Sequence, residues 1–230
     1  MTEQSRAHHH DRATADHAAG PGDGPGERPG DGPADWDERY AGSGQVWSGR
    51  PNGALVTETE DLSPGRALDV GCGEGADAVW LALRGWEVTG LDVSRVALDR
   101  AAAAAADAGV RVRWLADGLL EADLEPGGFD LVSVQYPALR RTTQHDAERA
   151  LLTAVAPGGT LLVVLHADVD AEQSRDHGFD PEDYVGRDEV VAVLDDGWRV
   201  ETDERRPRTV DGGSGAHHTH DLVLTARRLR

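Results

Sequence analysis

The feature that most limits the fold of this chain is an alternation of short apolar runs with helix-patterned segments, which begins at Arg66. Strands are predicted at Arg66–Val70, Trp86–Asp92, Val110–Leu115, Phe129–Val134 and Thr160–Leu165. Helices are predicted at Gly75–Arg84, Ser94–Ala108 and His145–Ala156, the last closed by Pro157-Gly158-Gly159. Strands that alternate with helices are typical of βαβ units and a mostly parallel sheet.

The alternation stops near the C-terminus. A predicted helix at Asp188–Asp195 is followed by two strand patterns, Trp198–Arg206 and His220–Arg228, with no helix between them. Two consecutive strands without a crossover helix pair antiparallel or lie apart. We therefore expect an α/β fold whose parallel sheet ends in a C-terminal antiparallel hairpin.

Residues 1–34 differ from the rest because they contain no Leu, Ile, Val or Phe. Without apolar groups to bury, nothing offsets the entropy lost on ordering this segment. We expect 1–34 to be a disordered Gly/Pro/His-rich tail and 35–230 to be one folded domain. The chain has a single cysteine, no signal-peptide pattern and no apolar run near the ~20 residues of a membrane span, so we expect a cytoplasmic protein without a membrane partner.

The charge balance is strongly acidic, with 23 basic against 42 acidic residues and a net charge of −19. Every basic residue is Arg, so mechanisms that need a lysine are excluded. The best basic patch, Arg199–Arg208, is interleaved with acidic residues. An acidic surface repels phosphate backbones, so we expect no nucleic-acid partner.

A glycine-rich turn lies between the first predicted strand and its helix. The spacing Gly71-x-Gly73-x-x-Ala76 lets the bare backbone and a helix N-terminus approach a ligand. The same spacing fits the loose dinucleotide fingerprint. A nicotinamide-dependent oxidoreductase is therefore an alternative interpretation of this turn.

Three carboxylates around this turn narrow the chemical class of ligand that it could bind. Asp69 lies in the strand before the glycines, where it would repel a pyrophosphate and hold an ammonium group. Asp92 closes the second strand, where an acid accepts both ribose hydroxyls. Asp117 follows the third strand, within reach of an adenine amino group. The ligand is an adenosine with a cationic amino-acid end, which fits S-adenosylmethionine and not NAD.

Five segments, LDVGCGEG, GLDVS, LAD, FDLVSV and APGGTLLVV, resemble the class I S-adenosylmethionine-dependent methyltransferases. The resemblance covers about residues 36 to 230 and implies a Rossmann-like, doubly wound, seven-stranded sheet. It places Asp69, Gly71 and Gly73 at the methionine moiety, Asp92 at the ribose, and Asp117 with Gly118 at the adenine. The residues expected at the cofactor are Arg50, Asp69, Gly71, Cys72, Gly73, Asp92, Val93, Asp117 and Gly118. Packing beneath the turn is the preferred role of Cys72, with a catalytic thiol as the alternative.

The opening of the domain, WDERYAGSGQVWSGRPN, resembles the lid of a small-molecule branch that includes tellurite-resistance and thiopurine-type methyltransferases. The resemblance implies that Trp36, Tyr40 and Trp47 close over the cofactor and that Arg50 holds its carboxylate. The alternative is an amphipathic helix whose aromatic residues cover the sheet edge.

Methyl transfer from a sulfonium is an in-line displacement in which the protein mainly orients the nucleophile. Two candidate catalytic residues follow predicted strands, Tyr136 and His166. Gln135-Tyr136-Pro137 departs from the Asn/Asp-Pro-Pro-aromatic pattern of nucleic-acid and protein-amide methyltransferases, which argues against those acceptors.

Two further groups of side chains, the C-terminal histidines and an arginine pair, are considered as binding sites. His217, His218 and His220 have no third ligand at a fixed spacing, so we predict no metal site. Arg140-Arg141 suits either an anionic substrate or a solvated loop.

The sequence thus predicts an S-adenosylmethionine-dependent methyltransferase that acts on a small molecule as a monomer or homodimer. An NAD(P)-dependent oxidoreductase and a non-catalytic S-adenosylmethionine-binding module are the alternatives. The acceptor atom stays undetermined.

Overall fold

A computed structural model of the chain describes residues 32–42, 44–176, 180–208 and 217–230. The expected disordered tail lies outside these residues up to position 31. The first described helix begins at Pro33, and the division into a tail and one folded domain stays a prediction.

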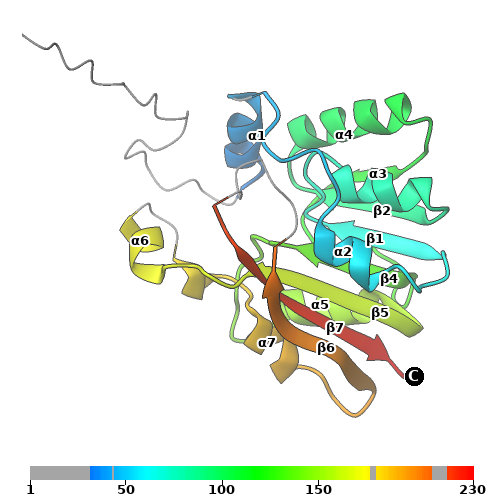
Figure 1. The fold of residues 1–230 in the computed structure, drawn as a ribbon, viewed down its shortest axis with the longest axis vertical. Helices are drawn as coiled ribbons and strands as arrows, with labels where there is room; N and C mark the ends of the chain where they lie inside the picture. Colours follow the sequence, from blue (N-terminus) through cyan, green and yellow to red (C-terminus); the bar gives the residue numbers. More distant parts are fainter. Residues whose placement is uncertain (1–31, 43, 177–179, 209–216) are drawn as a thin grey trace, which may run out of the picture.

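Seven strands form one sheet in the order β3-β2-β1-β4-β5-β7-β6 (Figure 1). Their bounds are β1 Arg66–Val70, β2 Glu87–Asp92, β3 Arg113–Ala116, β4 Phe129–Gln135, β5 Val155–His166, β6 Trp198–Pro207 and β7 His220–Arg228. Strands β1 to β5 pair in parallel, and β7 is antiparallel to both β5 and β6. The predicted mostly parallel α/β sheet with a C-terminal antiparallel hairpin is confirmed.

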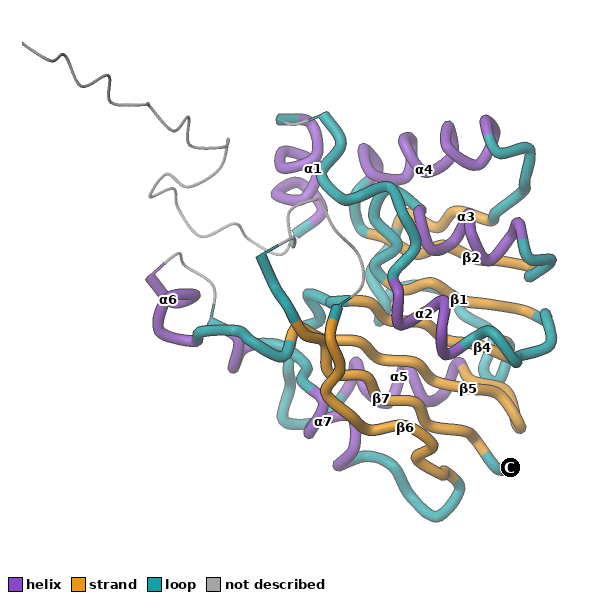
Figure 2. The backbone as a smooth tube through the Cα atoms, viewed as in Figure 1, coloured by secondary structure: helices purple, strands orange, loops and turns teal. Residues whose placement is uncertain are grey.

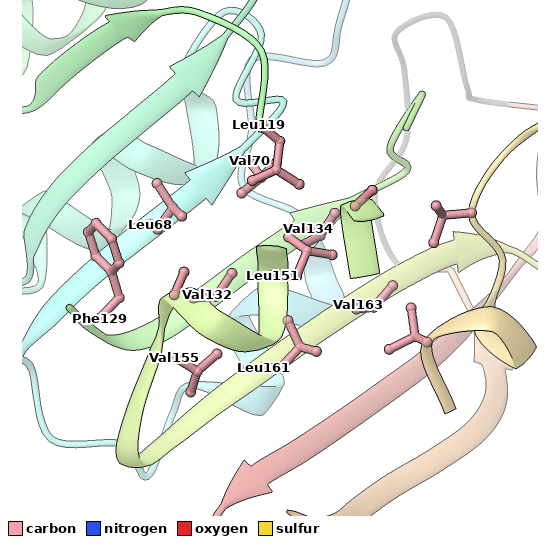
Figure 3. Packing of buried hydrophobic residues seen from close by; sticks show 14 of the residues in the cluster. Leu68, Val70, Leu119, Phe129, Val132, Val134, Leu151, Val155, Leu161 and Val163 are labelled. Carbon is pink, nitrogen blue, oxygen red and sulfur yellow. The ribbon is translucent and has the colours of Figure 1, made fainter. Parts of the chain in front are cut away.

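Helices cover both faces of this sheet (Figure 2). Their bounds are α1 Pro33–Ala41, α2 Gly53–Glu58, α3 Ala76–Leu83, α4 Arg95–Asp107, α5 Asp146–Ala154, α6 Ala171–Asp176 and α7 Arg187–Ala192, with a 3-10 turn at Pro181–Asp183. One core lies between the sheet and helices α5 and α7, and it includes Val190. Figure 3 shows Leu151 of α5 in this core, near Val132 and Leu161 of the sheet. A second core lies under α2 and α3, where Leu55 and Leu81 pack on Leu162.

The predicted end of the third helix is wrong. Helix α5 ends at Ala154, and Pro157-Gly158-Gly159 lies inside β5 rather than closing a helix. The register between β4 and β5 shifts in this stretch, because Phe129 pairs with Val155 whereas Leu131 pairs with Thr160. The proline has no N–H to donate and Gly158 has a φ of +80°, so the strand bulges here.

Two other boundaries each differ by three residues from the prediction. Strand β3 begins at Arg113 rather than at Val110, because the Val110 N–H donates to the Ala105 carbonyl and ends helix α4 instead. Helix α7 ends at Ala192, three residues before its expected end. The N-cap predicted at Ser94 is confirmed, since its Oγ accepts from the Ala97 N–H at 3.1 Å.

We expect Gly75→Ala to lower the free energy of unfolding by ~2 kcal/mol or more, as measured by urea denaturation. Gly75 has a φ of +81°, and an added Cβ would lie 2.7 Å from the Ala101 Cβ. A left-handed non-glycine residue costs about 1–3 kcal/mol, and the clash adds to that cost. Gly71→Ala is the matched control, because Gly71 has a φ of +68° but open space around the added Cβ. Equal losses in the two variants would show that the contact with α4 is not tight.

Candidate functional site

The glycine-rich turn predicted to bind a ligand lies at the carboxyl ends of β1, β2 and β3. The Gly71 and Cys72 N–H groups donate to the Leu91 carbonyl at 2.8 and 3.0 Å, which ties the turn to β2. The Asp117 N–H donates to the Asp92 carbonyl at 3.1 Å, which ties the residue after β3 to the end of β2. These backbone bonds bring Asp69, Asp92 and Asp117 to one edge of the sheet, as predicted.

Asp69 is the most unusual group at this edge. Its side chain is buried, and its Oδ2 has no hydrogen-bond partner among the described residues. Burial raises the pKa of the Asp69 carboxyl well above its usual range, and the nearby Asp77 and Asp92 raise it further. An isolated buried carboxylate is costly unless a cation or donor faces it.

Asp77, in the first turn of α3, is a second buried carboxylate and was missed by sequence reasoning. It accepts from the Asn52 N–H and from Asn52 Nδ2, both at 2.7 Å. Burial raises the pKa of Asp77 to about 6 in spite of these bonds. This pair fixes the start of α2 on the start of α3, 25 residues away in the chain. The only sequence signal was an acid in the first turn of a helix.

Asp92 ends β2 and holds the turn from the other side. Its Oδ2 accepts from the Gly73 N–H at 2.8 Å, and its Oδ1 accepts from the Ser94 N–H at 2.9 Å. Burial raises the pKa of Asp92, and these two bonds oppose that shift. A carboxylate offers about four acceptor positions, so room is left for two further donors.

The segment 44–52 and helix α1, which we call the lid, lie against the turn. Trp47 Nε1 donates to the Tyr40 hydroxyl at 2.8 Å, and Tyr40 is buried. A Cβ at Gly73 would lie 2.9 Å from that hydroxyl and 3.1 Å from Trp47 Nε1. The two aromatic residues therefore sit directly over Gly73, whereas the position above Gly71 is open.

Three charged residues that sequence reasoning missed hold the lid in place. Glu74 accepts from the Trp47 N–H at 3.0 Å and pairs with Arg100 at 2.8 Å. Arg100 also donates to the Tyr40 carbonyl at 2.6 Å. Asp37 accepts from Ser94 Oγ at 2.6 Å, so α1 is bonded to the start of α4. None of these contacts joins neighbouring residues, which explains why local patterns did not reveal them.

The remaining predicted cofactor residues occupy varied positions. Val93 lies between Asp92 and Ser94 and is half-buried, and the exposed Asp117 accepts from the Gly118 N–H at 3.0 Å. The Arg50 side chain is exposed just before α2, and its role as a carboxylate ligand stays a prediction. Burial raises the pKa of the Cys72 thiol well above its usual range, which favours packing over a reactive thiolate.

The two candidate catalytic residues, Tyr136 and His166, meet farther along the same edge. Their rings stack at 4.1 Å, and His218 stacks on the other face of His166 at 3.7 Å. Arg208 joins this group, because its Nη1 lies 3.2 Å from His166 Nδ1. Tyr136 has a φ of +50°, which is uncommon for a residue with a large side chain.

Of the other groups singled out in the sequence, His218 joins this stack with His217 packed on it, whereas His220 and the two arginines make other contacts. His220 Nδ1 lies 4.0 Å from Asp168, and no group of three or more metal-ligating side chains occurs in the described parts of the chain. Arg140 pairs with Asp183 of the 3-10 turn at 3.1 Å, and Arg141 pairs with Glu189 of α7 at 2.9 Å.

Comparisons with known proteins agree on one domain type. Residues 67–159 match a family model described as a methyltransferase domain. Over 121 residues the chain is 35% identical to ribosomal RNA small subunit methyltransferase C of Alcanivorax borkumensis, covering 50% of this chain and 37% of that protein. It is 38% identical over 96 residues to a ubiquinone biosynthesis O-methyltransferase of Chromobacterium violaceum, covering 41% of each. The chain thus spans about half or less of these curated relatives.

Solved structures extend the likeness over most of the chain. A structure from work on the conversion of a disulfide bond into a thioacetal group during echinomycin biosynthesis has a TM-score of 0.69 and 25% identity, covering 85% of this chain and 92% of that one. The N-methyltransferase NodS of Bradyrhizobium japonicum, solved with S-adenosyl-l-homocysteine, has a TM-score of 0.59 and 22% identity, covering 87% and 90%. Among the residues that the structure describes, no helix has both the length and the apolar character needed to cross a membrane.

Proposed function

We propose that this chain, which carries an S-adenosylmethionine-dependent methyltransferase domain, transfers the methyl group of that cofactor to a small-molecule acceptor. When bound, S-adenosylmethionine supplies an activated methyl group on a sulfonium. The protein residues bind and orient the two reactants and exclude water.

The buried Asp69 carboxylate is the observation that carries this proposal. Its Oδ2 lacks a partner within the described chain, and the ammonium group of the cofactor's amino-acid end is the charge that would satisfy it. The open position above Gly71 leaves room for that end, and the two acceptor positions left on Asp92 suit the ribose hydroxyls. The residues present therefore fit the cofactor.

The same carboxylates argue against the oxidoreductase alternative. A pyrophosphate over the turn would meet Asp69, Asp77 and Asp92, whose charges already oppose one another. The acidic charge of −19 likewise supports a small acceptor over a nucleic acid. Each arginine of the basic patch Arg199–Arg208 pairs with an acid, as Arg199 does with Glu201, and this pairing also argues against a phosphate-backbone partner. The position of Tyr40 and Trp47 over Gly73 supports a lid of the kind found in the tellurite-resistance and thiopurine branch.

Calorimetric titration of the full chain tests the cofactor. We expect S-adenosylmethionine and S-adenosylhomocysteine to bind and NADH not to bind. Transfer of labelled methyl to thiols, phenols, amines and small-subunit ribosomal RNA then tests the acceptor. Binding of NADH alone contradicts the proposal, transfer to RNA contradicts its acceptor class, and binding without transfer to any acceptor favours a non-catalytic module.

We expect Asp92→Asn to weaken S-adenosylhomocysteine binding by about 1.5–3 kcal/mol, because two ribose hydroxyls lose a charged acceptor. Asn is preferable to Ala here, since the remaining oxygen still accepts one of the bonds from Gly73 and Ser94. Asp117→Asn is the control, because that side chain is exposed and a smaller loss is expected. Unchanged affinity in a folded Asp92→Asn variant would remove Asp92 from the site.

A further inference from the structure

A row of polar side chains follows the apolar core on one face of the sheet. Leu131 of β4, Leu162 of β5 and Val223 of β7 all pack in the core beneath α2 and α3. Because side chains alternate along a strand, Gln135 and His166 share that face at the carboxyl edge, and so does Asp221. Asp221 pairs directly with His166 in the β5–β7 register, and Asp69 shares the face with Ala67.

Polar atoms without partners gather in this row. Five buried side-chain atoms in the described chain lack a hydrogen bond, and four of them belong to Asp69, Gln135, Asp221 and Arg208. Asp69 is accounted for by the cofactor. The other three are an acceptor on Gln135, Oδ1 of Asp221 and the Nε donor of Arg208. An unmade hydrogen bond of a buried group costs about 1–3 kcal/mol, which a binding site tolerates when its ligand supplies the partner.

Asp221 and Arg208 present one acceptor and one donor next to each other. Their side chains are only 5% and 10% exposed, and Arg208 Nη1 lies 3.7 Å from Asp221 Oδ1. Arg208 also lies over the Tyr136 ring, with its Cζ 4.6 Å from the ring centroid. A hydroxyl group is complementary to this pair, because it donates one hydrogen bond and accepts another.

The proton acceptor in this cluster is not His166. A guanidinium only donates, so His166 Nδ1 accepts from Arg208 and the ring proton lies on Nε2. Burial and the neighbouring His218 and Arg208 lower the pKa of His166 to about 3, which leaves it a poor base. Tyr136 hydrogen-bonds to Asp221, and burial raises its pKa above the usual range, so its phenol stays protonated. Burial raises the pKa of Asp221, as a general base requires.

Flat rings border the same cluster. Tyr136, His166 and His218 form a continuous stack with interplanar angles of 17° and 14°. Because Arg208 lies over Tyr136 and His217 packs on His218, a ligand meets the edges of these rings, and an edge-to-face contact favours an aromatic ligand over an aliphatic one. Strand β4, which carries Gln135, lies between β1 with Asp69 and β5 with His166. The cluster therefore lies beside the expected cofactor position along the carboxyl edge of the sheet.

We propose that the acceptor is a phenol, with Asp221 as the catalytic base and Arg208 as the donor to the phenol oxygen. This inference rests on the proposed function. The phenol proton passes to the Asp221 carboxylate while an oxygen lone pair forms the new O–CH3 bond. The S–CH3 bond breaks, its electron pair stays on sulfur, and neutral S-adenosylhomocysteine and a methyl ether result. Arg208 stabilises the negative charge that develops on the oxygen.

The first test measures binding rather than activity. Catechol is titrated into the full chain saturated with S-adenosylhomocysteine, and its dimethyl ether, which lacks the O–H donors, is titrated in parallel. We expect catechol to bind about 10- to 100-fold more tightly, because only its O–H groups can donate to Asp221, and we expect Arg208→Gln to weaken catechol binding, because the phenol oxygen loses its donor. Equal binding of the phenol and its ether would overturn the proposal.

The second test uses Asp221→Asn, with Glu204→Gln as the matched carboxylate-to-amide control on the exposed side of the β6–β7 hairpin. Glu204 is 55% exposed and pairs with Arg206. We expect Asp221→Asn to keep the S-adenosylhomocysteine affinity and to slow methyl transfer to catechol about 10²- to 10⁴-fold, with partial recovery as pH rises and free phenolate forms. The control should stay near the wild-type rate.

The outcomes separate the two proposals. A chain that does not bind S-adenosylmethionine contradicts the proposed function itself. A chain that binds it and methylates thiols or amines but not phenols contradicts only the phenol inference, as does an Asp221→Asn variant that transfers methyl to catechol at the wild-type rate. Lower thermal stability together with lost cofactor affinity in that variant would show that Asp221 is a structural residue and would also overturn the inference.

Discussion

Asp69→Asn is expected to weaken S-adenosylmethionine binding about 10- to 100-fold and, at the same time, to stabilise the folded chain by ~1 kcal/mol or more. The substitution removes a buried charge that lacks a partner on Oδ2 and that lies near Asp77 and Asp92. Its size and hydrogen-bonding reach are kept, so little packing is lost. Calorimetry measures the first effect and urea unfolding at pH 7 to 8 measures the second.

Adenosine serves as the control ligand, because it lacks the amino-acid end that we expect to face Asp69. Its affinity should change little in the Asp69→Asn variant. Asp77→Asn serves as the control variant, because Asp77 accepts two bonds from Asn52 at 2.7 Å and an amide has one acceptor oxygen. That variant should be less stable by about 1–3 kcal/mol. A contrary result would be an Asp69→Asn variant whose affinities for adenosine and S-adenosylmethionine fall equally and whose melting temperature is lower. Asp69 would then be a structural residue that stabilises the turn.

The raised pKa values of the Asp69 and Asp77 carboxyls predict how the free energy of unfolding depends on pH. Their pKa values are raised in the folded state, so the folded chain binds more protons than the unfolded chain over this range. Their contribution to stability therefore decreases as pH rises through the unfolded pKa of about 4, and for Asp77 the decrease ends near its folded pKa of about 6. Unfolding experiments between pH 4 and 8 should show a shallower decrease for Asp69→Asn than for the natural chain.

Glu74→Ala is expected to release the lid and to produce the second large effect. The variant loses the acceptor for the Val46 and Trp47 N–H groups and the pair with Arg100 at 2.8 Å. Two or three such bonds at about 1 kcal/mol each correspond to a ~30- to 150-fold increase in amide exchange at 46 and 47. We also expect a several-fold loss of cofactor affinity, because Tyr40 and Trp47 no longer stay over Gly73.

Arg100→Met separates the contribution of the Glu74–Arg100 ion pair from that of the hydrogen bonds between Glu74 and the lid backbone. It removes the cation from Glu74 but leaves the carboxylate that accepts from the lid backbone, so exchange at 46 and 47 should increase less than in Glu74→Ala. The backbone of α4 should keep its protection in both variants. Unchanged exchange at these two amides in Glu74→Ala would show that other contacts hold the lid.

The sequence determined the elements whose signals are local. The bounds of β1 and β7 were predicted to the residue, and Ser94 was predicted as an N-cap, because alternation, helical periodicity and capping are properties of a few consecutive residues. The glycine-rich turn and the acids at the strand ends were also predictable, because their spacing is local, and their role in binding a ligand stays a prediction. Pro157-Gly158-Gly159 misled the prediction, because a proline followed by glycines ends a helix as readily as it bulges a strand.

Only the tertiary structure decided which side chains meet. Asp77 with Asn52, Glu74 with Arg100, and Arg208 with His166 are 25, 26 and 42 residues apart in the chain. The last of these depends on β7 lying between β5 and β6, an order that no local pattern contains. Contacts of this kind arise from strand order, register and burial acting together. The glycine-rich turn was therefore predictable from the sequence, whereas the cluster proposed for the acceptor required the folded sheet.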